Sequence, residues 1–180
     1  MKFVAGESFI VNSDKIHGPN LSTAIYGNVV NSTGSIIPLI WDAIKNDYEL
    51  TLYSEEMTRF ILLIEQSVDL IEFALTKNGY NVIPKPRSIK IKDLFDIYKD
   101  KFGLKYKVGV PRISEKIHEI LISGEESTRV TIDGDYYLMH YENTTNKNIL
   151  GGNELSSKNS CISKEILIEL LSIHNYYKQY

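Results

Sequence analysis

The sequence has almost no cysteine and no long hydrophobic run. Cys161 is the single cysteine among 180 residues, so an internal disulfide is excluded and a reducing compartment is expected. No apolar run reaches the roughly 20 residues that a membrane-spanning helix needs, and the stretch around Glu7 lacks a signal-peptide core. We therefore expect a cytoplasmic protein that does not use a membrane as a partner.

The sequence also lacks an excess of positive charge. Its net charge is −3, and the four basic residues between Lys85 and Lys92 are followed by Asp93 and Asp96. No extended positive field attracts nucleic acid, so nucleic acid is not an expected partner. The hydrophobic fraction of 43% and the length of 180 residues favour one globular domain.

Several catalytic signatures are missing. There is no GxGxxG dinucleotide loop, no GxxxxGK[ST] phosphate loop, no GxSxG nucleophile elbow, and no tyrosine followed by a lysine four residues later. The four histidines are scattered without metal-ligand spacing. The residues alone therefore indicate no metal site and no complete catalytic motif.

The hydrophobic pattern alternates between strand-like and helix-like segments, which is typical of an α/β fold. In the 65–75 helix, Val68, Leu70, Ile71, Ala74 and Leu75 form one wide apolar face. Ser163 is placed to cap the last helix. The predicted strands are 23–30, 49–53, 80–83, 104–110 and 136–141, the predicted helices are 34–46, 65–75, 89–102, 115–122 and 164–177, and the polar stretch 143–160 is a predicted loop.

Five segments, in order, carry a resemblance to a known family. They are SDKIHGPN from Ser13, YGNVVNSTGSIIP from Tyr26, MTRF from Met57, VIPKPRSIKIKDL from Val82 and EKIHEILIS from Glu115. Together they resemble the polysaccharide-biosynthesis branch of the extended short-chain dehydrogenases. That branch contains the UDP-N-acetylglucosamine 4,6-dehydratases and related nucleotide-sugar epimerases. Each segment is weak alone, and the resemblance covers residues 1–141.

The resemblance implies an α/β fold that is the C-terminal remnant of an NAD(P)-binding Rossmann-type domain with its substrate-binding lobe. Residues 1–141 would hold the last Rossmann strands and this lobe, and residues 142–180 a polar loop and a C-terminal helix. Family members bind NADP through a glycine-rich first half and use a tyrosine-lysine helix. This sequence has neither, so we expect a truncated chain that binds no NADP alone.

The resemblance assigns catalytic roles to two residues near the N-terminus. Asp14 would be the acid and Lys15 the base of the family's dehydratase chemistry, which oxidises the sugar by hydride transfer to NADP. The alternative reading has both side chains solvated and idle, because the tyrosine and the cofactor half are missing. We favour the idle reading.

The resemblance also implies a site for a UDP-sugar. Arg59 and Arg112 would bracket the pyrophosphate, since guanidinium groups match phosphate oxygens. Asn28 would contact a phosphate or sugar oxygen, and Glu115 the ribose hydroxyls. The alternatives are a surface arginine for Arg59, a strand-end asparagine for Asn28 and a first-turn helix charge for Glu115. Thr33 replaces an arginine that the family carries. His118 is expected to be a packed or capping residue.

Three hypotheses follow for the function. The chain is a truncated relative of the nucleotide-sugar dehydratases and epimerases that is inactive alone, or it is an active enzyme subunit completed by another chain that supplies the Rossmann half. The third hypothesis is an interaction module that uses an exposed sheet edge. Missing strands would expose apolar surface, so we expect a homo-oligomer or poor solubility unless such a partner covers it.

Overall fold

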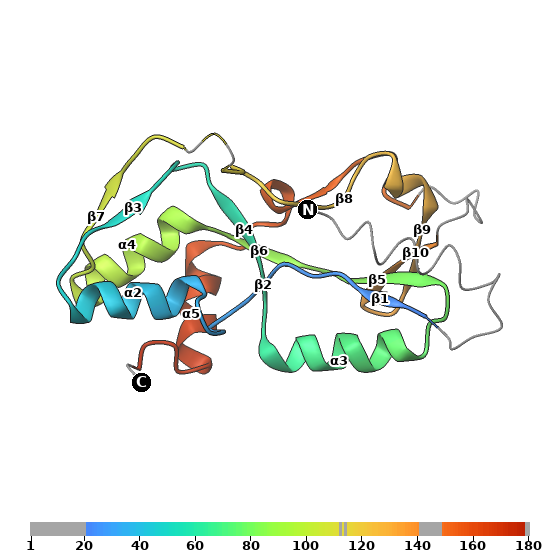
Figure 1. Cartoon of the computed structure of the whole chain (residues 1–180), viewed down its shortest axis with the longest axis horizontal. Coiled ribbons are helices and arrows are strands. Elements are labelled where there is room, and N and C mark those ends of the chain that lie inside the picture. The colour runs from blue at the N-terminus through green and yellow to red at the C-terminus, as the bar shows by residue number, and fades with distance from the viewer. Residues whose placement is uncertain (1–20, 112, 114, 141–148, 179–180) are drawn as a thin grey trace. The chain divides into compact units, whose positions relative to one another are not determined.

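The computed structural model describes residues 21–111, 113, 115–140 and 149–178. Strands and helices alternate along the chain (Figure 1), as the hydrophobic pattern predicts. The described residues divide into two units by their internal contacts. Unit 1 contains residues 21–26, 64–86, 120–140 and 149–156, and unit 2 contains residues 27–63, 87–119 and 157–178.

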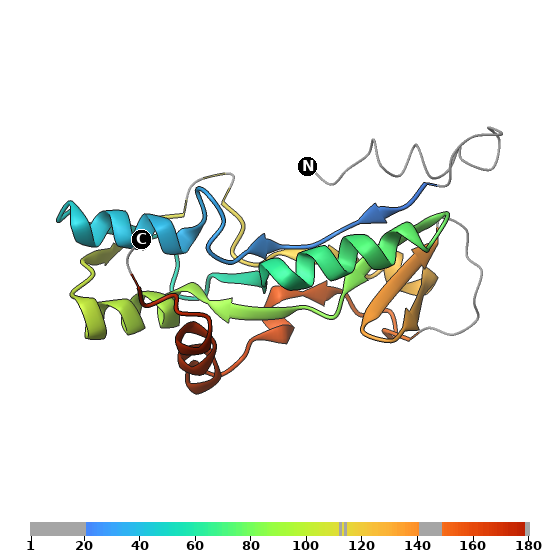
Figure 2. The same ribbon diagram turned by 90° about the horizontal axis from the view of Figure 1, so that it is seen from below.

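Unit 1 is a mixed four-stranded sheet with one long helix. The strand order is β1-β5-β10-β9, in which β1 is parallel to β5 and the other two pairs are antiparallel. Helix α3 (Ile64–Leu75) packs along β1 and β5 (Figure 2). The strands are β1 (Thr23–Ala24), β5 (Tyr80–Pro84), β9 (Val130–Asp133) and β10 (Tyr136–His140), and the unit is completed by the 3-10 helix η1 (Glu126–Arg129) and the pair β8 (Ile120–Ile122) and β11 (Leu155–Ser156).

Helix α3 buries a narrower face than its sequence suggests. Leu70 and Ala74 are 0% and 4% exposed, whereas Val68, Ile71 and Leu75 are 49%, 47% and 76% exposed. The sheet beneath α3 covers only the residues that lie one helical turn apart on a single line. The remaining apolar side chains form a stripe on the solvent side of α3.

The described residues of unit 2 form a three-stranded sheet, a two-stranded sheet, three α-helices and one 3-10 helix. The strand order is β2-β4-β6, with β2 parallel and β6 antiparallel to β4. Strands β3 and β7 form a separate parallel pair. The strands are β2 (Asn28–Val29), β3 (Leu50–Leu52), β4 (Thr58–Leu62), β6 (Arg87–Lys90) and β7 (Tyr106–Val108), and the helices are α2 (Ile36–Lys45), α4 (Ile91–Phe102), α5 (Lys164–Ile173) and the 3-10 helix η2 (Ser157–Ser160).

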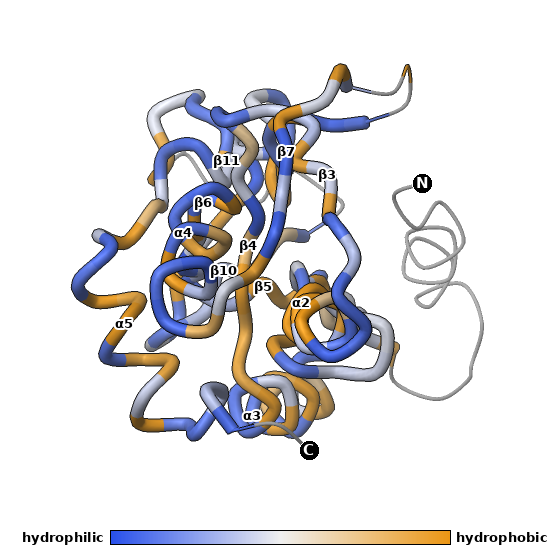
Figure 3. Tube along the Cα trace, turned by 90° about the vertical axis from the view of Figure 1, so that its left-hand side faces the viewer, coloured by the Kyte–Doolittle hydropathy of each residue, from blue (hydrophilic) through white to orange (hydrophobic). Residues whose placement is uncertain are grey.

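The core of unit 2 lies between α2, α4 and α5. The inward-facing residues predicted for α4, namely Ile91, Leu94, Phe95 and Tyr98, are all buried, which confirms the helical period. The hydroxyl of Tyr98 donates a hydrogen bond to the carbonyl of Tyr176 at 2.7 Å, and burial raises its pKa. In Figure 3, hydrophobic and hydrophilic residues alternate along α5, which buries Leu167, Leu170 and Leu171 in this core.

Some sequence predictions are wrong. Residues 115–119 form no helix, and β8 starts at Ile120, so the predicted 115–122 helix is incorrect. The segment is held against β4 instead: the Thr58 amide donates to the Ile117 carbonyl at 2.9 Å, and the Phe60 amide donates to the Glu119 carboxylate at 3.0 Å. Helix α5 ends at Ile173, and Ile166 and Ile173 are exposed rather than buried.

Two strand predictions also need correction. The predicted 23–30 strand is two short strands, β1 and β2, which belong to different sheets. Strand β4 was missed, because the apolar residues that follow Arg59 continue directly into α3. The capping prediction is confirmed, since the Ser163 hydroxyl accepts a hydrogen bond from the Ile166 amide.

Candidate functional site

A cavity of about 330 Å³ lies within unit 2. Apolar side chains from α2, β3, α4 and α5 make up most of its wall. Six residues with polar side chains also line it, and these are Asn28, Ser35, Thr51, Tyr53, Arg59 and Glu115. A mostly apolar hollow with a few polar groups is the usual form of a small-molecule site.

Asn28 reaches the cavity because the chain passes very close to β4. A Cβ atom on Gly27 would clash with the Cβ of Phe60, so a glycine is needed at this position. Asn28 then pairs with Ile61 as the first residue of β2. The turn that follows contains Asn31 with a φ of 60°, a left-handed conformation that asparagine tolerates. This turn leads the chain directly into α2.

The N-terminus of α2 opens onto the same cavity. Ser35, the N-cap residue, makes no capping hydrogen bond through its side chain, and its buried hydroxyl oxygen has no partner. The amides of the first helical turn have no carbonyl partner within a helix, and Pro38 has no amide hydrogen to satisfy. The end of α2 therefore offers free donors and a partial positive charge, which together favour an anion.

Arg59 lies on β4 with its side chain only 15% exposed. One terminal nitrogen, Nη1, donates to the Thr58 carbonyl at 2.8 Å and to the Ile117 carbonyl at 3.3 Å. The other, Nη2, donates to the Glu115 carboxylate at 2.8 Å. The guanidinium group is thus fixed at the cavity by two backbone carbonyls, and its Nη2 atom is paired with a carboxylate.

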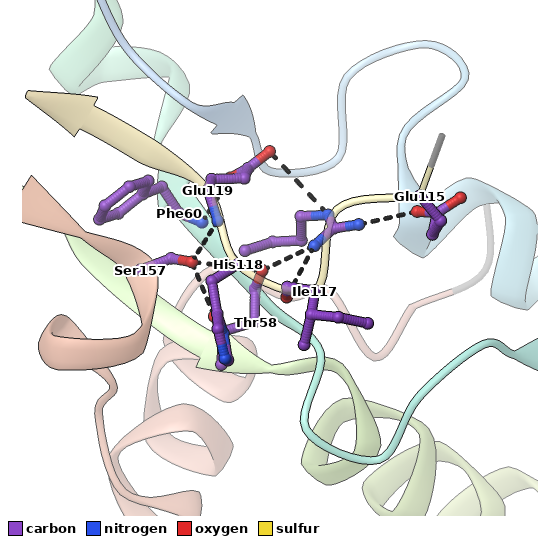
Figure 4. A network of polar contacts seen from close by, with 8 residues as sticks. Thr58, Phe60, Glu115, Ile117, His118, Glu119 and Ser157 are labelled. Carbon is purple, nitrogen blue, oxygen red and sulfur yellow. Dashed lines mark hydrogen bonds and ion pairs between the residues drawn. The ribbon is translucent and has the colours of Figure 1, made fainter. Parts of the chain in front are cut away.

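Glu119 contacts Arg59 and the backbone of β4 without lining the cavity. Its Oε2 atom accepts a hydrogen bond from the Phe60 amide at 3.0 Å, and its Oε1 atom lies 3.9 Å from Arg59 Nε. Figure 4 shows Glu119 beside Phe60, and Glu115 on the other side of the network. Of these two carboxylates, only Glu115 lines the cavity.

The structure brings three of the predicted site residues together. Asn28, Arg59 and Glu115 line one cavity, and Arg59 is paired with Glu115 across 56 residues of sequence. Asp14, Lys15 and Arg112 lie outside the described residues.

Other residues had weaker signals in the sequence. His118 is half-buried and its Nδ1 atom lies 2.8 Å from the Thr58 hydroxyl, as expected for a packed residue. The sequence analysis missed the contributions of Ser35 and Glu119. Ser35 could have been predicted as a helix N-cap, because it precedes an apolar run with a proline in its first turn. Nothing near Glu119 in the sequence indicates its bond to β4.

Two kinds of feature are absent from the described part of the chain. No group of three or more histidine, cysteine, aspartate or glutamate residues there is arranged to hold a metal ion. Among the same residues, no helix has both the length and the apolar character to cross a membrane.

Two solved structures share the fold. Pen from Bacillus thuringiensis matches 97% of this chain and 56% of its own, with a TM-score of 0.84 and 24% identity. A UDP-N-acetylglucosamine 4-epimerase from Methanobrevibacter ruminantium, solved with UDP-N-acetylmuramic acid, matches 61% of this chain and 39% of its own, with a TM-score of 0.50 and 22% identity. These likenesses show that the chain has the α/β fold of a part of each of these two proteins.

The family follows from the sequence comparison. The chain belongs to the family described as polysaccharide biosynthesis protein, whose model matches residues 2–141. This confirms the resemblance seen in the five sequence segments.

Two relatives illustrate the sequence similarity. A protein of Methanocaldococcus jannaschii, described as an uncharacterized membrane protein, is 34% identical over 164 residues. The UDP-glucose 4-epimerase of Rickettsia canadensis is 37% identical over 116 residues. The chain spans 49% of the first protein and 34% of the second, so it corresponds to a part of each.

Proposed function

We propose that unit 2 binds a nucleotide sugar of the UDP class, and that the chain alone does not convert it. The observation that carries this proposal is the meeting of Asn28, the α2 N-terminus, Arg59 and Glu115 around one cavity. Each supplies a group that a sugar nucleotide needs: donors for phosphate oxygens and an acceptor for ribose hydroxyls. The relatives named as UDP-sugar epimerases agree with this ligand class.

The pyrophosphate would lie between Arg59 and the first turn of α2. A guanidinium group and a helix N-terminus are both suited to phosphate oxygens. The free structure pairs Arg59 with Glu115, so binding would exchange this carboxylate for a phosphate. Glu115, once released, would accept hydrogen bonds from the ribose, and Asn28 would contact a phosphate or sugar oxygen. The apolar wall would exclude water around the nucleotide.

The residues of this chain do not fit NADP. The sequence has no GxGxxG loop to receive the pyrophosphate of a dinucleotide, and no YxxxK pair. We therefore propose that residues 1–180 alone carry out no hydride transfer, and that turnover needs a Rossmann half that lies outside these residues. Asp14 and Lys15 keep their proposed acid and base roles only together with that half.

Calorimetric titration of the full chain tests the proposal. We expect UDP and UDP-N-acetylglucosamine to bind, NADP not to bind, and the isolated chain to leave the sugar nucleotide unchanged. Arg59→Ala should weaken UDP binding by about tenfold or more, because a charged hydrogen bond to phosphate contributes roughly 1.5–3 kcal/mol. A wild-type chain that fails to bind UDP would refute the ligand class, and turnover by the chain alone would refute inactivity.

Arg87→Ala is the matched control. Arg87 is an exposed arginine of the neighbouring strand β6 and does not line the cavity. Its removal changes the net charge equally, so UDP affinity should stay within about twofold of wild type if long-range charge is a minor effect. Equal losses in both variants would mean that Arg59 acts only through overall charge.

A further inference from the structure

The C-terminal segment, which the family model does not match, folds back against the candidate site. The family match ends at residue 141, yet η2 and α5 belong to unit 2. The Ser157 amide donates to the Glu119 carbonyl at 2.8 Å, and the Ser88 hydroxyl donates to the Ser157 carbonyl at 2.5 Å. Ser157 is therefore held between β6 and the 115–119 segment.

The hydroxyl of Ser157 links the two backbone segments that carry the site. It accepts a hydrogen bond from the Glu119 amide at 2.8 Å and lies 2.7 Å from the Thr58 hydroxyl (Figure 4). Thr58 in turn bonds to His118 Nδ1 at 2.8 Å. Thr58 precedes Arg59 on β4, and Glu119 follows the loop that contains Glu115. One buried side chain thus joins both halves of the site.

The Glu119 amide can only donate, so the Ser157 oxygen accepts from it. Ser157 has two acceptors on Thr58 for its own proton, namely the hydroxyl at 2.7 Å and the carbonyl at 3.4 Å. In the arrangement in which Ser157 donates to the Thr58 hydroxyl, the bonds run in one direction. Thr58 then donates to His118 Nδ1 when that nitrogen carries no proton. Hydrogen bonds aligned in one direction strengthen one another. Ser157 and Thr58 are 0% and 2% exposed, so water cannot replace either partner without a rearrangement.

The position of Arg59 depends on the same two segments. Its Nη1 atom bridges the Thr58 carbonyl and the Ile117 carbonyl. If the 115–119 segment moved away from β4, the guanidinium group would lose one of these two acceptors and its alignment with Glu115. Ser157 keeps the 115–119 segment close to β4, and this distance sets the orientation of the Arg59 guanidinium group.

We propose that Ser157 is a positioning residue of the nucleotide-sugar site, acting through Thr58 and Glu119 to hold Arg59 and Glu115 in register. This inference rests on the proposed function of the cavity. It assigns to the C-terminal segment a role in ligand binding, because Ser157 lies outside the region that the family model matches.

The test compares Ser157→Ala with Ser127→Ala in the full chain. Both serines are 0% exposed, but the Ser127 hydroxyl donates to the Gly124 carbonyl within unit 1, and Ser127 does not line the cavity. Both variants should lower the melting temperature. Only Ser157→Ala should weaken UDP binding, by about five- to tenfold, the effect of losing one buried hydrogen bond. Equal weakening in both variants, or none in Ser157→Ala, would overturn the proposal.

Thr58→Val supplies a second test, because valine keeps the shape of threonine and removes its hydroxyl. If Ser157 acts through Thr58, the losses of UDP affinity in the single variants should not add in the Ser157→Ala/Thr58→Val double variant. Full additivity would mean that the two hydroxyls act separately.

A ligand-free measurement separates this inference from the proposed function. The NMR signal of the Arg59 Nε–H group should shift in Ser157→Ala and stay in place in Ser127→Ala, whether or not UDP binds. A signal that stays in place in Ser157→Ala would overturn the positioning role alone. Absence of UDP binding to wild type, with the signal shifted in Ser157→Ala, would refute the ligand and leave the positioning of Arg59 intact.

Discussion

At the scale of single residues, Arg59 has two competing partners. Its guanidinium group is paired with Glu115 at 2.8 Å in the free chain, and a phosphate would need the same nitrogen. Glu115 would therefore weaken the binding of inorganic pyrophosphate, because it neutralises Arg59. It would strengthen the binding of UDP in one respect, because it can accept hydrogen bonds from the ribose hydroxyls.

Glu115→Gln should therefore change the ligand preference of the site. Inorganic pyrophosphate should bind about three- to tenfold more tightly, because a partly buried ion pair of roughly 1 kcal/mol no longer competes for Arg59. UDP should gain less, because its ribose loses a charged acceptor. Calorimetric titration with both ligands measures the difference.

Glu169→Gln is the control for this substitution. Glu169 is an exposed residue of α5 that does not line the cavity, and its substitution removes the same charge. If pyrophosphate affinity rises equally in the two variants, the effect comes from net charge and Glu115 has no local role.

At the scale of elements, helix α3 carries apolar side chains on two faces, one buried and one exposed. Leu70→Ala should lower the free energy of unfolding by about 2–5 kcal/mol, the range for a large-to-small change in a core. Val68→Ala, at a position 49% exposed, should change it by about 0.5 kcal/mol or less. Urea denaturation followed by circular dichroism measures both. A similar cost for both variants would show that the outer stripe of α3 is covered in solution.

The helices were more predictable than the short strands. The inward residues of α4 recur every three or four positions, and Gly103 ends the helix with a φ of 74°. The local sequence is therefore enough to predict both the helix and its C-terminal end. Residues 117–122 contain apolar side chains that fit either period. Residues 120–122 form β8 by pairing with β11, and the Ile117 carbonyl accepts from the Thr58 amide of β4. The local sequence says nothing about either partner.

Three residues of the candidate site were predicted from the sequence, but the contacts between them were not. The family resemblance pointed to Asn28, Arg59 and Glu115, and all three line the cavity. The ion pair between Arg59 and Glu115 and the support from Ser157 join residues far apart in sequence. Ser157 lies in a serine- and asparagine-rich stretch that reads as a loop, so no local pattern distinguishes it. Tertiary contacts decided these features.

At the scale of the whole molecule, the chain alternates between the two units, so neither unit is a continuous stretch of sequence. A chain ending at residue 148 would keep the region matched by the family model and lose η2 and α5. Four side chains of the lost segment are buried in the core of unit 2, and these are Leu167, Leu170, Leu171 and Tyr176.

We expect this shortened chain to lose its cooperative unfolding transition. Each buried side chain contributes roughly 1.5–3 kcal/mol, and the sum approaches the whole stability of a typical domain. Near-ultraviolet circular dichroism and urea denaturation would show the loss. Removal of residues 179–180 is the control and should have no effect on the transition. A cooperative transition in the shortened chain would show that residues up to 148 fold independently.

The contacts between β4 and residues 117–119 also bear on association between molecules. Among the described residues, strand β2 pairs with β4 only at Ile61 and Leu62, which leaves the first residues of β4 without a strand on that side. The amides of Thr58 and Phe60 there donate to the Ile117 carbonyl and the Glu119 carboxylate. Unpaired amides at this place would be open to a strand of another molecule, which is a common route to aggregation. The segment that follows Glu115 therefore covers the part of β4 that β2 does not reach.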